Sequence, residues 1–273
     1  MSQTDTIRAA LQSGAVQIGR LEAMILLAHV LGKSKEFLIA HDDEALATDA
    51  KLRFDMLVSL RAAGTPIPYI TGHQEFFSRD FLVTDAVLIP RPDTEVLIEQ
   101  ALLVAPRQPR VIDLGTGSGC IAATLALEIP QACVTATDKS EAALAIAKEN
   151  ARRLGAKIDF RLGSWWESVG AEERFDLIVS NPPYIRPDDE HLAALGNEPS
   201  SALVGGEDGL ACLRDIVAGA MAHLTPNGWL LLEHGFDQGE AVRSLLCDAG
   251  FAAVRTKKDY GGNDRVTMGR RAP

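Results

Sequence analysis

Short apolar runs alternate with helical stretches from residue 110 onward, and this alternation restricts the possible folds more than any other feature of the sequence. Strands that alternate with helices favour a mainly parallel sheet covered on both faces. We therefore expect an α/β fold in which ligands bind beyond the carboxyl ends of the strands. In chain order, the pattern predicts a strand at 110–114, a helix from 119, a strand at 132–138, a helix at 140–154, strands at 157–162 and 176–181, a helix from 208, a strand at 229–234, a helix from 237, and strands at 251–256 and 264–269.

The N-terminal part of the chain contains helical patterns only. Ser34 and Thr48 are residue types that cap helices, and we expect each to begin one. Apolar residues recur at helical spacing in two groups, which are Leu21, Ile25, Ala28 and Leu31, and then Leu52, Met56 and Leu60. A chain of 273 residues exceeds the usual size of one domain. The sequence therefore predicts a small all-helical domain ahead of the α/β domain.

A segment rich in proline, aromatic and β-branched residues separates these two parts. Residues 81–84 and 86–89 are short extended pieces with Asp85 between them, and they are predicted to pair as a β-hairpin. We therefore expect a helical domain at residues 1–72, a linker with a β-hairpin at residues 73–92, and the α/β domain at residues 93–273.

Composition and charge exclude several classes of protein. The formal net charge is −10, and both parts are acidic: residues 1–75 carry 7 Lys and Arg against 9 Asp and Glu, and the remainder carries 20 against 28. This balance argues against a dedicated DNA-binding enzyme, because duplex binding neutralises phosphates with basic side chains. The four cysteines are widely spaced, so neither a disulfide framework nor a metal site is expected. Without a signal pattern, membrane-length apolar run or long unpaired apolar surface, we expect a cytoplasmic monomer that binds no membrane.

A glycine-rich loop follows the first predicted strand of the α/β domain. It reads Asp113-Leu-Gly115-Thr-Gly117-Ser-Gly119 and opens a helix. Glycines allow a backbone to turn sharply and to approach a ligand closely. The GxGxG spacing lacks the third glycine of the dinucleotide fingerprint, and no Gly-Lys-Ser/Thr follows as in a P-loop. We assign Asp113, Gly115, Thr116, Gly117, Ser118 and Gly119 to the binding of a cofactor.

Asp138 and Trp165 complete the predicted cofactor site. Asp138 ends the next strand, where a carboxylate can accept hydrogen bonds from both hydroxyls of a ribose. Asp113 can receive the ammonium group of an amino acid tail. Trp165 offers a flat apolar surface for an adenine, and we favour it over the neighbouring Trp166. Together these residues indicate an adenosine-type cofactor, whereas a tight turn with a capping aspartate is the structural alternative.

The strand at 176–181 ends in Asn181-Pro182-Pro183-Tyr184, the most informative tetrapeptide in the chain. The Asn181 side-chain oxygen and the Pro182 carbonyl can together accept both hydrogens of a planar NH2 group, and Tyr184 can pack on its π face. Such contacts favour pyramidalisation of a poorly nucleophilic amide nitrogen and disperse the positive charge that develops on it. We predict Asn181, Pro182 and Tyr184 as catalytic residues and the whole tetrapeptide as substrate-binding. Asn181 is also expected to contact the cofactor.

At these residues the chain resembles class I S-adenosylmethionine-dependent methyltransferases that carry an NPPY motif. Adenine-N6 DNA methyltransferases and glutamine-N5 protein methyltransferases share this tetrapeptide. Further segments resemble the peptide chain release factor glutamine methyltransferase family, and the similarity covers nearly the whole chain. These segments are YITGHQEFF from Tyr69, LIPRPDTEV from Leu88, VSNPPYI from Val179, the Glu198-Pro199 pair, LLEHG from Leu231 with Gly239-Glu240 following, and DYGGNDRVTMGR from Asp259.

The resemblance implies a Rossmann-like class I methyltransferase domain with a mostly parallel seven-stranded sheet. It implies that the glutamine of the GGQ loop in class I release factors is methylated at its side-chain nitrogen, which tunes translation termination. S-adenosyl-L-methionine would be the cofactor and S-adenosyl-L-homocysteine the product. Ser164 is a departure, because the family often has an acidic residue before the tryptophan that corresponds to Trp165.

Two other functions remain open at this point. An adenine-N6 nucleic acid methyltransferase would use the same amide-like recognition on a flipped base. A cofactor-binding, ribosome-associated adaptor without activity is the non-enzyme alternative. We expect the helical domain to dock the protein substrate. Residues 91–95 are expected either to begin a helix or to shape the mouth of the site. His234 is expected to be a hydrogen-bonded residue at the end of a strand.

Overall fold

The computed structural model describes residues 6–273, apart from the side chains of residues 191, 193 and 194. The first five residues of the predicted helical domain lie outside this range. The chain divides into two compact units, with the boundary between His73 and Gln74. The two units are described separately.

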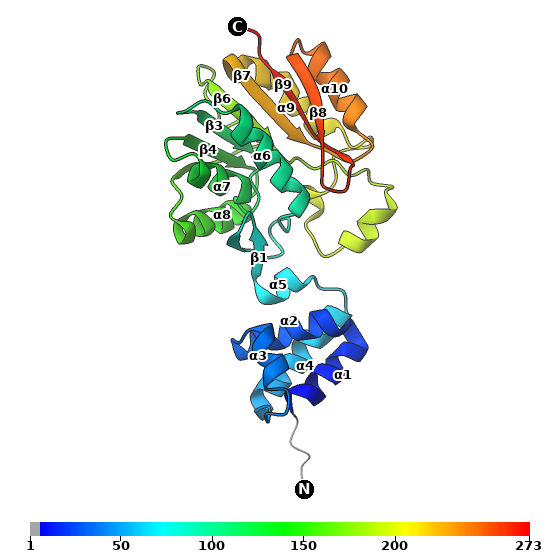
Figure 1. The fold of residues 1–273 in the computed structure, drawn as a ribbon. Coiled ribbons are helices and arrows are strands. Elements are labelled where there is room, and N and C mark those ends of the chain that lie inside the picture. Colours follow the sequence, from blue (N-terminus) through cyan, green and yellow to red (C-terminus); the bar gives the residue numbers. More distant parts are fainter. Residues whose placement is uncertain (1–5) are drawn as a thin grey trace. The chain divides into compact units, whose positions relative to one another are not determined.

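The first unit is helical, as the pattern predicted, and forms its own core around Leu26, Leu27 and Phe54. Ser34 caps its helix as expected, with Oγ accepting from the Phe37 backbone N–H at 3.2 Å. Thr48, however, lies inside its helix and caps nothing. The elements are α1 (Ile7–Ile18), α2 (Arg20–Leu31), α3 (Lys35–Ala40), α4 (Thr48–Ala62) and α5 (Ile67–Thr71) (Figure 1).

Helix α4 does not bury the leucine-rich face that its sequence pattern suggests. Ala50, Phe54 and Val58 are buried, whereas the stripe made by Leu52, Met56 and Leu60 is exposed. Both groups have helical spacing, so periodicity alone could not decide between them. The structure therefore leaves a row of large apolar side chains on the surface of the first unit.

The linker contains a hairpin, but the predicted pairing was wrong. The paired strands are β1 (His73–Phe76) and β2 (Arg79–Leu82), and the turn residues Phe77 and Ser78 have positive φ values of 50° and 59°. The rings of Phe76 and Phe81 pack edge to face with centroids 6.1 Å apart. The two-residue turn sets the observed pairing, and residues 83–91 are left as an irregular segment that forms part of the site described below.

The second unit is built on a seven-stranded sheet, which confirms the predicted α/β fold. The strand order is β5-β4-β3-β6-β7-β9-β8, and all neighbours are parallel except β9, which is antiparallel to β7 and β8 (Figure 1). The strands are β3 (Arg110–Leu114), β4 (Cys133–Asp138), β5 (Ile158–Leu162), β6 (Phe175–Ser180), β7 (Leu224–Glu233), β8 (Ala252–Lys258) and β9 (Asp264–Arg270).

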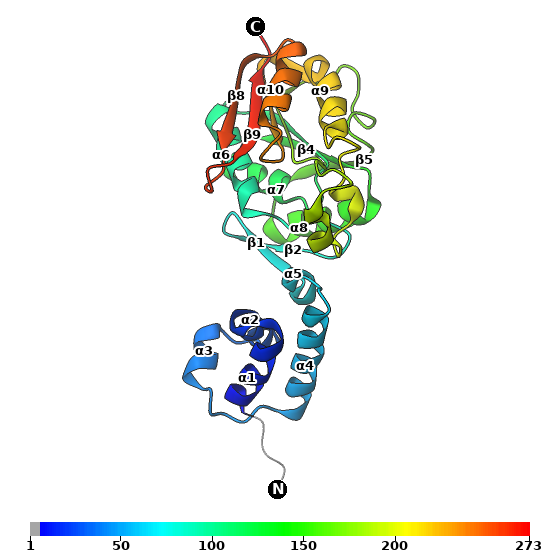
Figure 2. The same cartoon turned by 90° about the vertical axis from the view of Figure 1, so that its right-hand side faces the viewer.

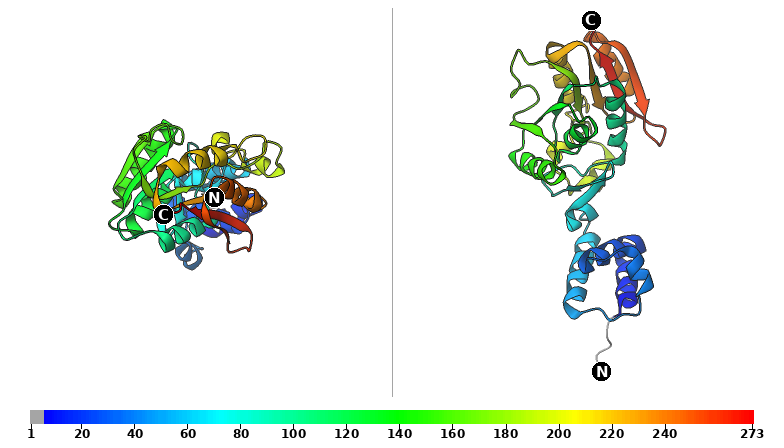
Figure 3. Two further views of the ribbon diagram at one scale, coloured as in Figure 1. Left: turned by 90° about the horizontal axis from the view of Figure 1, so that it is seen from above. Right: turned by 60° about the vertical axis from the view of Figure 1, so that its left-hand side comes forward.

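Helices cover both faces of this sheet (Figures 2 and 3). Side chains alternate across each strand, so Val111 packs with α6 and α7 on one face while Ile112 packs with α9 and α10 on the other. The helical elements are η1 (Pro92–Thr94), α6 (Glu95–Val104), α7 (Cys120–Glu128), α8 (Glu141–Leu154), η2 (Glu190–Leu195), η3 (Ser200–Ala202), α9 (Ala211–His223) and α10 (Gly239–Asp248).

The strand order places the predicted site residues at one edge of the sheet. The chain leaves β3 to form β4 on one side, and it later returns to form β6 on the other side. The direction of strand addition therefore reverses at β3, and such a switch point opens a crevice beyond the carboxyl ends of the strands. The glycine loop after β3, Asp138 on β4 and Asn181 after β6 all border this crevice.

Candidate active site

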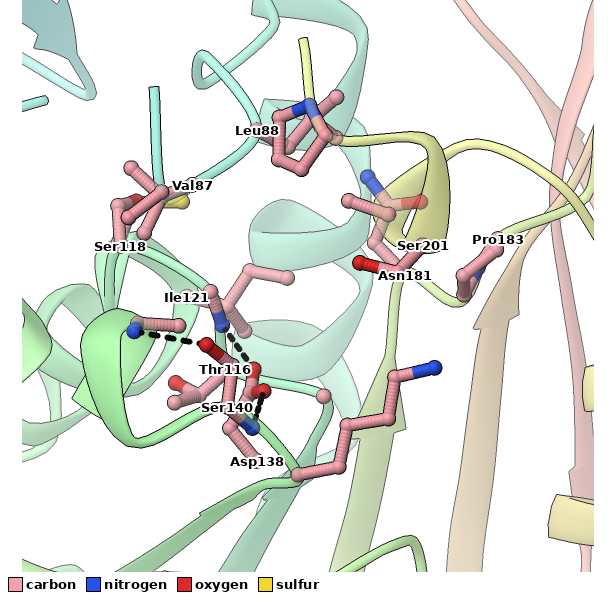
Figure 4. Close-up of a pocket in the computed structure, with 18 of the residues that line it drawn as sticks. Val87, Leu88, Thr116, Ser118, Ile121, Asp138, Ser140, Asn181, Pro183 and Ser201 are labelled. Carbon is pink, nitrogen blue, oxygen red and sulfur yellow. Dashed lines mark hydrogen bonds between the residues drawn. The ribbon is translucent and has the colours of Figure 1, made fainter. Parts of the chain in front are cut away.

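A cavity of about 280 Å³ occupies this crevice in the second unit (Figure 4). Its walls come from the glycine loop, the ends of β4 and β6, the irregular segment before η1, and the segment around η3. Most of the residues predicted to bind a cofactor border it, whereas Asp113 and Gly119 do not. The predicted residues on its wall are Gly115, Thr116, Gly117, Ser118, Asp138, Trp165, Asn181 and Pro183.

The glycine loop has the backbone conformation that its sequence requires. Gly115, Gly117 and Gly119 all have positive φ, at 74°, 55° and 79°. A Cβ at Gly117 would meet no atom within 4 Å, whereas one at Gly119 would lie 3.0 Å from the Ala147 Cβ. Gly117 thus leaves open backbone at the cavity, and Gly119 allows α7 to pack closely on α8.

Asp113 lies beneath this loop and is fully buried. Its Oδ2 accepts a hydrogen bond of 2.6 Å from the Thr116 hydroxyl, and its Oδ1 has no partner. Burial, with a smaller contribution from the charge of Asp138, raises the pKa of Asp113 to about 7. The unused oxygen of Asp113 therefore lies behind the loop that forms the cavity wall, and a buried carboxyl group of this kind is stabilised in its charged form by a nearby cation.

Asp138 does border the cavity, and two backbone groups hold its carboxylate in place. Oδ2 accepts from the Gly117 N–H at 2.9 Å, and Oδ1 accepts from the Ser140 N–H at 2.9 Å (Figure 4). Each oxygen can still accept one further hydrogen bond. The carboxylate therefore anchors the loop and remains available for a pair of ligand hydroxyls.

The two tryptophans after β5 have different environments. Trp165 borders the cavity with a positive φ of 45°, and its ring lies 3.1 Å from the position of a Cβ on Gly115. Trp166 is directed away: its indole N–H donates to the Ile216 carbonyl at 3.2 Å, and its ring stacks on His223. Trp165 is thus the tryptophan positioned for a planar ligand, while Trp166 packs against α9.

A second cavity, of about 130 Å³, lies beside the first one. Pro182 and Tyr184 line it together with Ile185 and Leu195. Asn181 borders both cavities, so its side chain marks the place where a ligand in one could meet a ligand in the other.

The Asn181 amide has one satisfied end and one free end. Its Nδ2 donates to the Thr94 hydroxyl at 3.2 Å, whereas its buried Oδ1 has no hydrogen-bond partner. A buried carbonyl oxygen without a donor costs about 1–3 kcal/mol, so this oxygen is suited to accept a hydrogen bond from a bound ligand. This is the acceptor that the tetrapeptide predicted.

Sequence reasoning missed the residues that hold the tetrapeptide backbone. Gln238 at the start of α10 donates to the Tyr184 carbonyl at 3.0 Å. A Cβ at Gly205 would lie 2.5 Å from the Pro183 carbonyl oxygen, and one at Gly209 would lie 2.4 Å from the Tyr184 oxygen. These glycines therefore let two loops touch backbone to backbone. The cluster of glycines between residues 205 and 209 was the available signal.

A buried charged group beside the site was also missed. Glu233 ends β7 and is 1% exposed, and burial raises its pKa to about 7. Arg265 on β9 lies nearby and pairs with Asp259 at 2.9 Å and with Asp93 at 3.3 Å. Burial also raises the pKa of Tyr184, so its hydroxyl stays protonated. The sequence signal for Glu233 was its place at the end of a strand next to β6.

The irregular segment before η1 is tied to the loop that follows β6. Glu198 is nearly buried, forms an ion pair with Arg91, and accepts from the Ile89 backbone N–H at 3.1 Å. Residues of both segments border the larger cavity, so this contact closes one of its walls. Residues 91–95 begin a helix, as one of the two sequence interpretations predicted, because Pro92–Thr94 form η1 and Glu95 opens α6. Arg91 and Thr94 of the same segment border the larger cavity. Their acid Glu95 accepts from the Phe77 N–H at 2.9 Å in the hairpin turn.

Other predicted features are simpler. His234 is buried and hydrogen-bonded, with Nε2 2.8 Å from the Thr267 hydroxyl, which confirms the structural interpretation of this residue. Across residues 6–273, no group of three or more His, Cys, Asp or Glu side chains is arranged to hold a metal ion. Within the same range, the structure contains no helix that is long and apolar enough to cross a membrane.

Comparison with known proteins identifies the family. Residues 92–198 match the family described as methyltransferase small domain, and residues 5–72 match the PrmC N-terminal domain. The release factor glutamine methyltransferase of Xylella fastidiosa strain Temecula1 is 51% identical, with 96% of this chain and 97% of that protein covered. The protein of the same name from Bordetella pertussis is 49% identical, covering 92% and 94%.

A solved structure supports the fold alone. A methyltransferase from Pyrococcus furiosus superposes with a TM-score of 0.56 at 19% identity, covering 72% of this chain and 91% of that one. With the family matches in both units and close relatives along nearly the whole length, the chain belongs to the release factor glutamine methyltransferase family.

Proposed function

We propose that this protein transfers a methyl group from S-adenosyl-L-methionine to the side-chain amide nitrogen, N5, of the glutamine in the GGQ loop of class I release factors. One observation carries the proposal most directly: Asn181 borders both cavities, and its buried Oδ1 has no hydrogen-bond partner. The names of the relatives with 49% and 51% identity support the substrate.

The larger cavity fits S-adenosylmethionine by the chemistry of its walls. The anchored carboxylate of Asp138 suits the hydroxyls of a ribose, and Asp113, buried behind the glycine loop, would favour the cationic ammonium group of a methionine moiety. Trp165 suits the adenine, and the open backbone at Gly117 accommodates the amino acid end. When bound, S-adenosylmethionine supplies an electrophilic methyl group on sulfur.

The chain's own residues would then prepare the substrate nitrogen. Asn181 Oδ1 and the Pro182 carbonyl accept the two N–H groups of the glutamine amide, while the Tyr184 ring restricts the amide from the second cavity. Holding both hydrogens reduces conjugation of the nitrogen lone pair with its carbonyl and stabilises positive charge on the nitrogen. The proton becomes acidic only after transfer, so no base is needed beforehand.

The helical first unit is proposed to dock the release factor. A glutamine on a protein loop must be held by remote contacts if binding energy is to orient its nitrogen. The exposed stripe of Leu52, Met56 and Leu60 on α4 is a surface of suitable chemistry for such a contact. A release factor substrate would place the reaction in the cytoplasm, and we propose that the enzyme acts as a monomer.

Substitutions in this proposed docking surface should weaken use of the protein substrate without weakening cofactor binding. In the triple variant Leu52→Ser, Met56→Ser, Leu60→Ser, methyl transfer to an intact release factor should lose at least about tenfold in kcat/KM, while the Kd for S-adenosylmethionine stays within twofold of wild type. A matched control is Ile39→Ser, which also removes an exposed apolar side chain from the first unit. An equal loss in both triple-variant measurements would contradict the docking role.

The proposed reaction is tested by transfer of labelled methyl to a purified release factor, to its GGQ glutamine-to-alanine variant, and to adenine-containing DNA. Label on the intact factor alone, lost with Asn181→Ala in the enzyme, supports the proposal. Label on DNA would favour an adenine-N6 methyltransferase instead, although the net charge of −10 opposes it. No label on any substrate would favour a cofactor-binding adaptor.

A further inference from the structure

The proposed reaction depends on which end of the Asn181 amide faces the substrate. The two ends have nearly the same size and shape, yet only the oxygen can accept an N–H from the reacting amide. A flipped side chain would present its own NH2 group to the substrate NH2 group. Some part of the protein must therefore discriminate between the two orientations.

Two buried polar residues adjoin the Asn181 side chain. Thr94, 2% exposed, accepts a hydrogen bond from Asn181 Nδ2 at 3.2 Å. Glu233 is next to Asn181 because β6 and β7 are parallel and Ser180 is in register with Leu232. The side chains of both Thr94 and Asn181 interact with the Glu233 carboxyl group and favour its charged form.

The chemistry of this arrangement is directional. An ionised carboxylate can only accept hydrogen bonds, so Glu233 draws the Thr94 hydroxyl proton toward itself. The Thr94 oxygen then presents its lone pairs to Asn181, and only the NH2 end of the amide can satisfy them. The buried Oε2 of Glu233 has no hydrogen-bond partner, and Glu233 lines neither cavity, whereas Thr94 borders the larger one.

We propose that Thr94 and Glu233 are positioning residues, which hold the Asn181 side chain with its NH2 group turned inward and its oxygen turned toward the reacting amide. This inference rests on the proposed function. Neither residue needs to contact the transferred methyl group. Their effect passes entirely through the orientation of Asn181, so they should alter kcat rather than the binding of the cofactor.

The protonation state of Glu233 should appear in the pH dependence. Burial raises its pKa to about 7, the Arg265 guanidinium opposes that rise, and Asp93 adds to it. Tyr184 remains neutral over this range. Protonated Glu233 can itself donate a hydrogen bond to the Thr94 oxygen, which leaves the Thr94 hydroxyl proton free to point toward Asn181, so the orientation is lost at low pH. The kcat should rise with pH and level off above the pKa of Glu233.

The first test compares Thr94→Val with Thr94→Ser. Valine keeps the shape but removes the hydroxyl, whereas serine keeps the hydroxyl. We expect Thr94→Val to lower kcat about 10- to 100-fold, the loss of one orienting hydrogen bond, and Thr94→Ser to recover most of it. The Kd for S-adenosylmethionine should stay within about threefold in both. A Thr94→Val enzyme with kcat within twofold of wild type, or a cofactor affinity that falls in parallel with kcat, overturns the inference.

The second test uses Glu233→Gln and a pH profile of kcat between pH 5.5 and 8.5, a window chosen to span the pKa of about 7. The variant should have lower kcat and no acidic limb, while wild type shows that limb. An acidic limb that persists unchanged in Glu233→Gln overturns the role of Glu233. Activity of the wild-type enzyme on the release factor in the same assay tests the proposed function separately, so a failure of one is distinguishable from a failure of the other.

Discussion

Gly205 provides the sharpest test of how the tetrapeptide at residues 181–184 is held. A Cβ at this position would lie 2.5 Å from the Pro183 oxygen, 2.7 Å from the Gly209 oxygen and 2.8 Å from the Tyr184 Cα. All three are backbone atoms, so no flexible side chain can move aside. Since ordinary contacts begin near 3.4 Å, Gly205→Ala must displace the tetrapeptide by up to about 0.9 Å, the gap between 2.5 and 3.4 Å.

A displacement of this size has consequences for both stability and rate. Overpacking costs about 1–3 kcal/mol, which lowers Tm by about 2–4 °C for each kcal/mol in a unit of this size. A misplacement of about 1 Å at reacting groups can cost on the order of 100-fold in rate. We therefore expect Gly205→Ala to remain folded at 25 °C, to bind S-adenosylmethionine, and to lose about 100-fold in kcat.

The matched control is Gly170→Ala. Gly170 also lies outside helices and strands with no positive φ, but its Cβ would meet only the Glu173 side chain at 3.4 Å. The assays are thermal unfolding, calorimetric titration with S-adenosylmethionine, and single-turnover methyl transfer. The reasoning is refuted if Gly205→Ala transfers methyl within twofold of Gly170→Ala while both remain folded.

Three further outcomes follow from the geometry of the site. Trp165→Ala should weaken the Kd for S-adenosylmethionine about tenfold with little change in Tm, and Trp166→Ala should do the reverse, as calorimetry and thermal unfolding of both can check. Because a cationic ligand prefers ionised Asp113, whose pKa is raised to about 7, cofactor affinity should rise with pH from 6 to 7.5, and Asp113→Asn should abolish that rise. The stability of the ligand-free protein should change with pH in the opposite direction to cofactor affinity. Because folding raises the pKa of Asp113 from the unfolded value near 3.8 to about 7, its contribution to stability is fully present below pH 3.8 and is lost as pH rises through 7. Urea unfolding at several pH values measures this loss. Glu198→Gln breaks the ion pair with Arg91 that closes one wall of the cavity, so it should speed dissociation of S-adenosylmethionine in stopped-flow measurements, and an unchanged rate would show that the wall closes without it.

The sequence by itself determined the sheet, the order of its helices and the place of the cofactor loop. Strand–helix periodicity and glycine spacing are local properties, and parallel strands must bring their carboxyl ends to one edge. Asp138 and Asn181 could therefore be assigned to the site from their positions after β4 and β6.

Only the tertiary structure decided which of several equivalent local patterns is used. Leu52 and Phe54 both lie on helical stripes of α4, and packing chose the stripe of Phe54. The hairpin turns at Phe77 and Ser78, two residues of types that rarely adopt positive φ, so local turn chemistry gave no signal for it. Glu233, Gly205 and Gln238 were not predicted because their roles depend on partners far away in sequence, and a contact of that kind leaves no periodic signal in the chain.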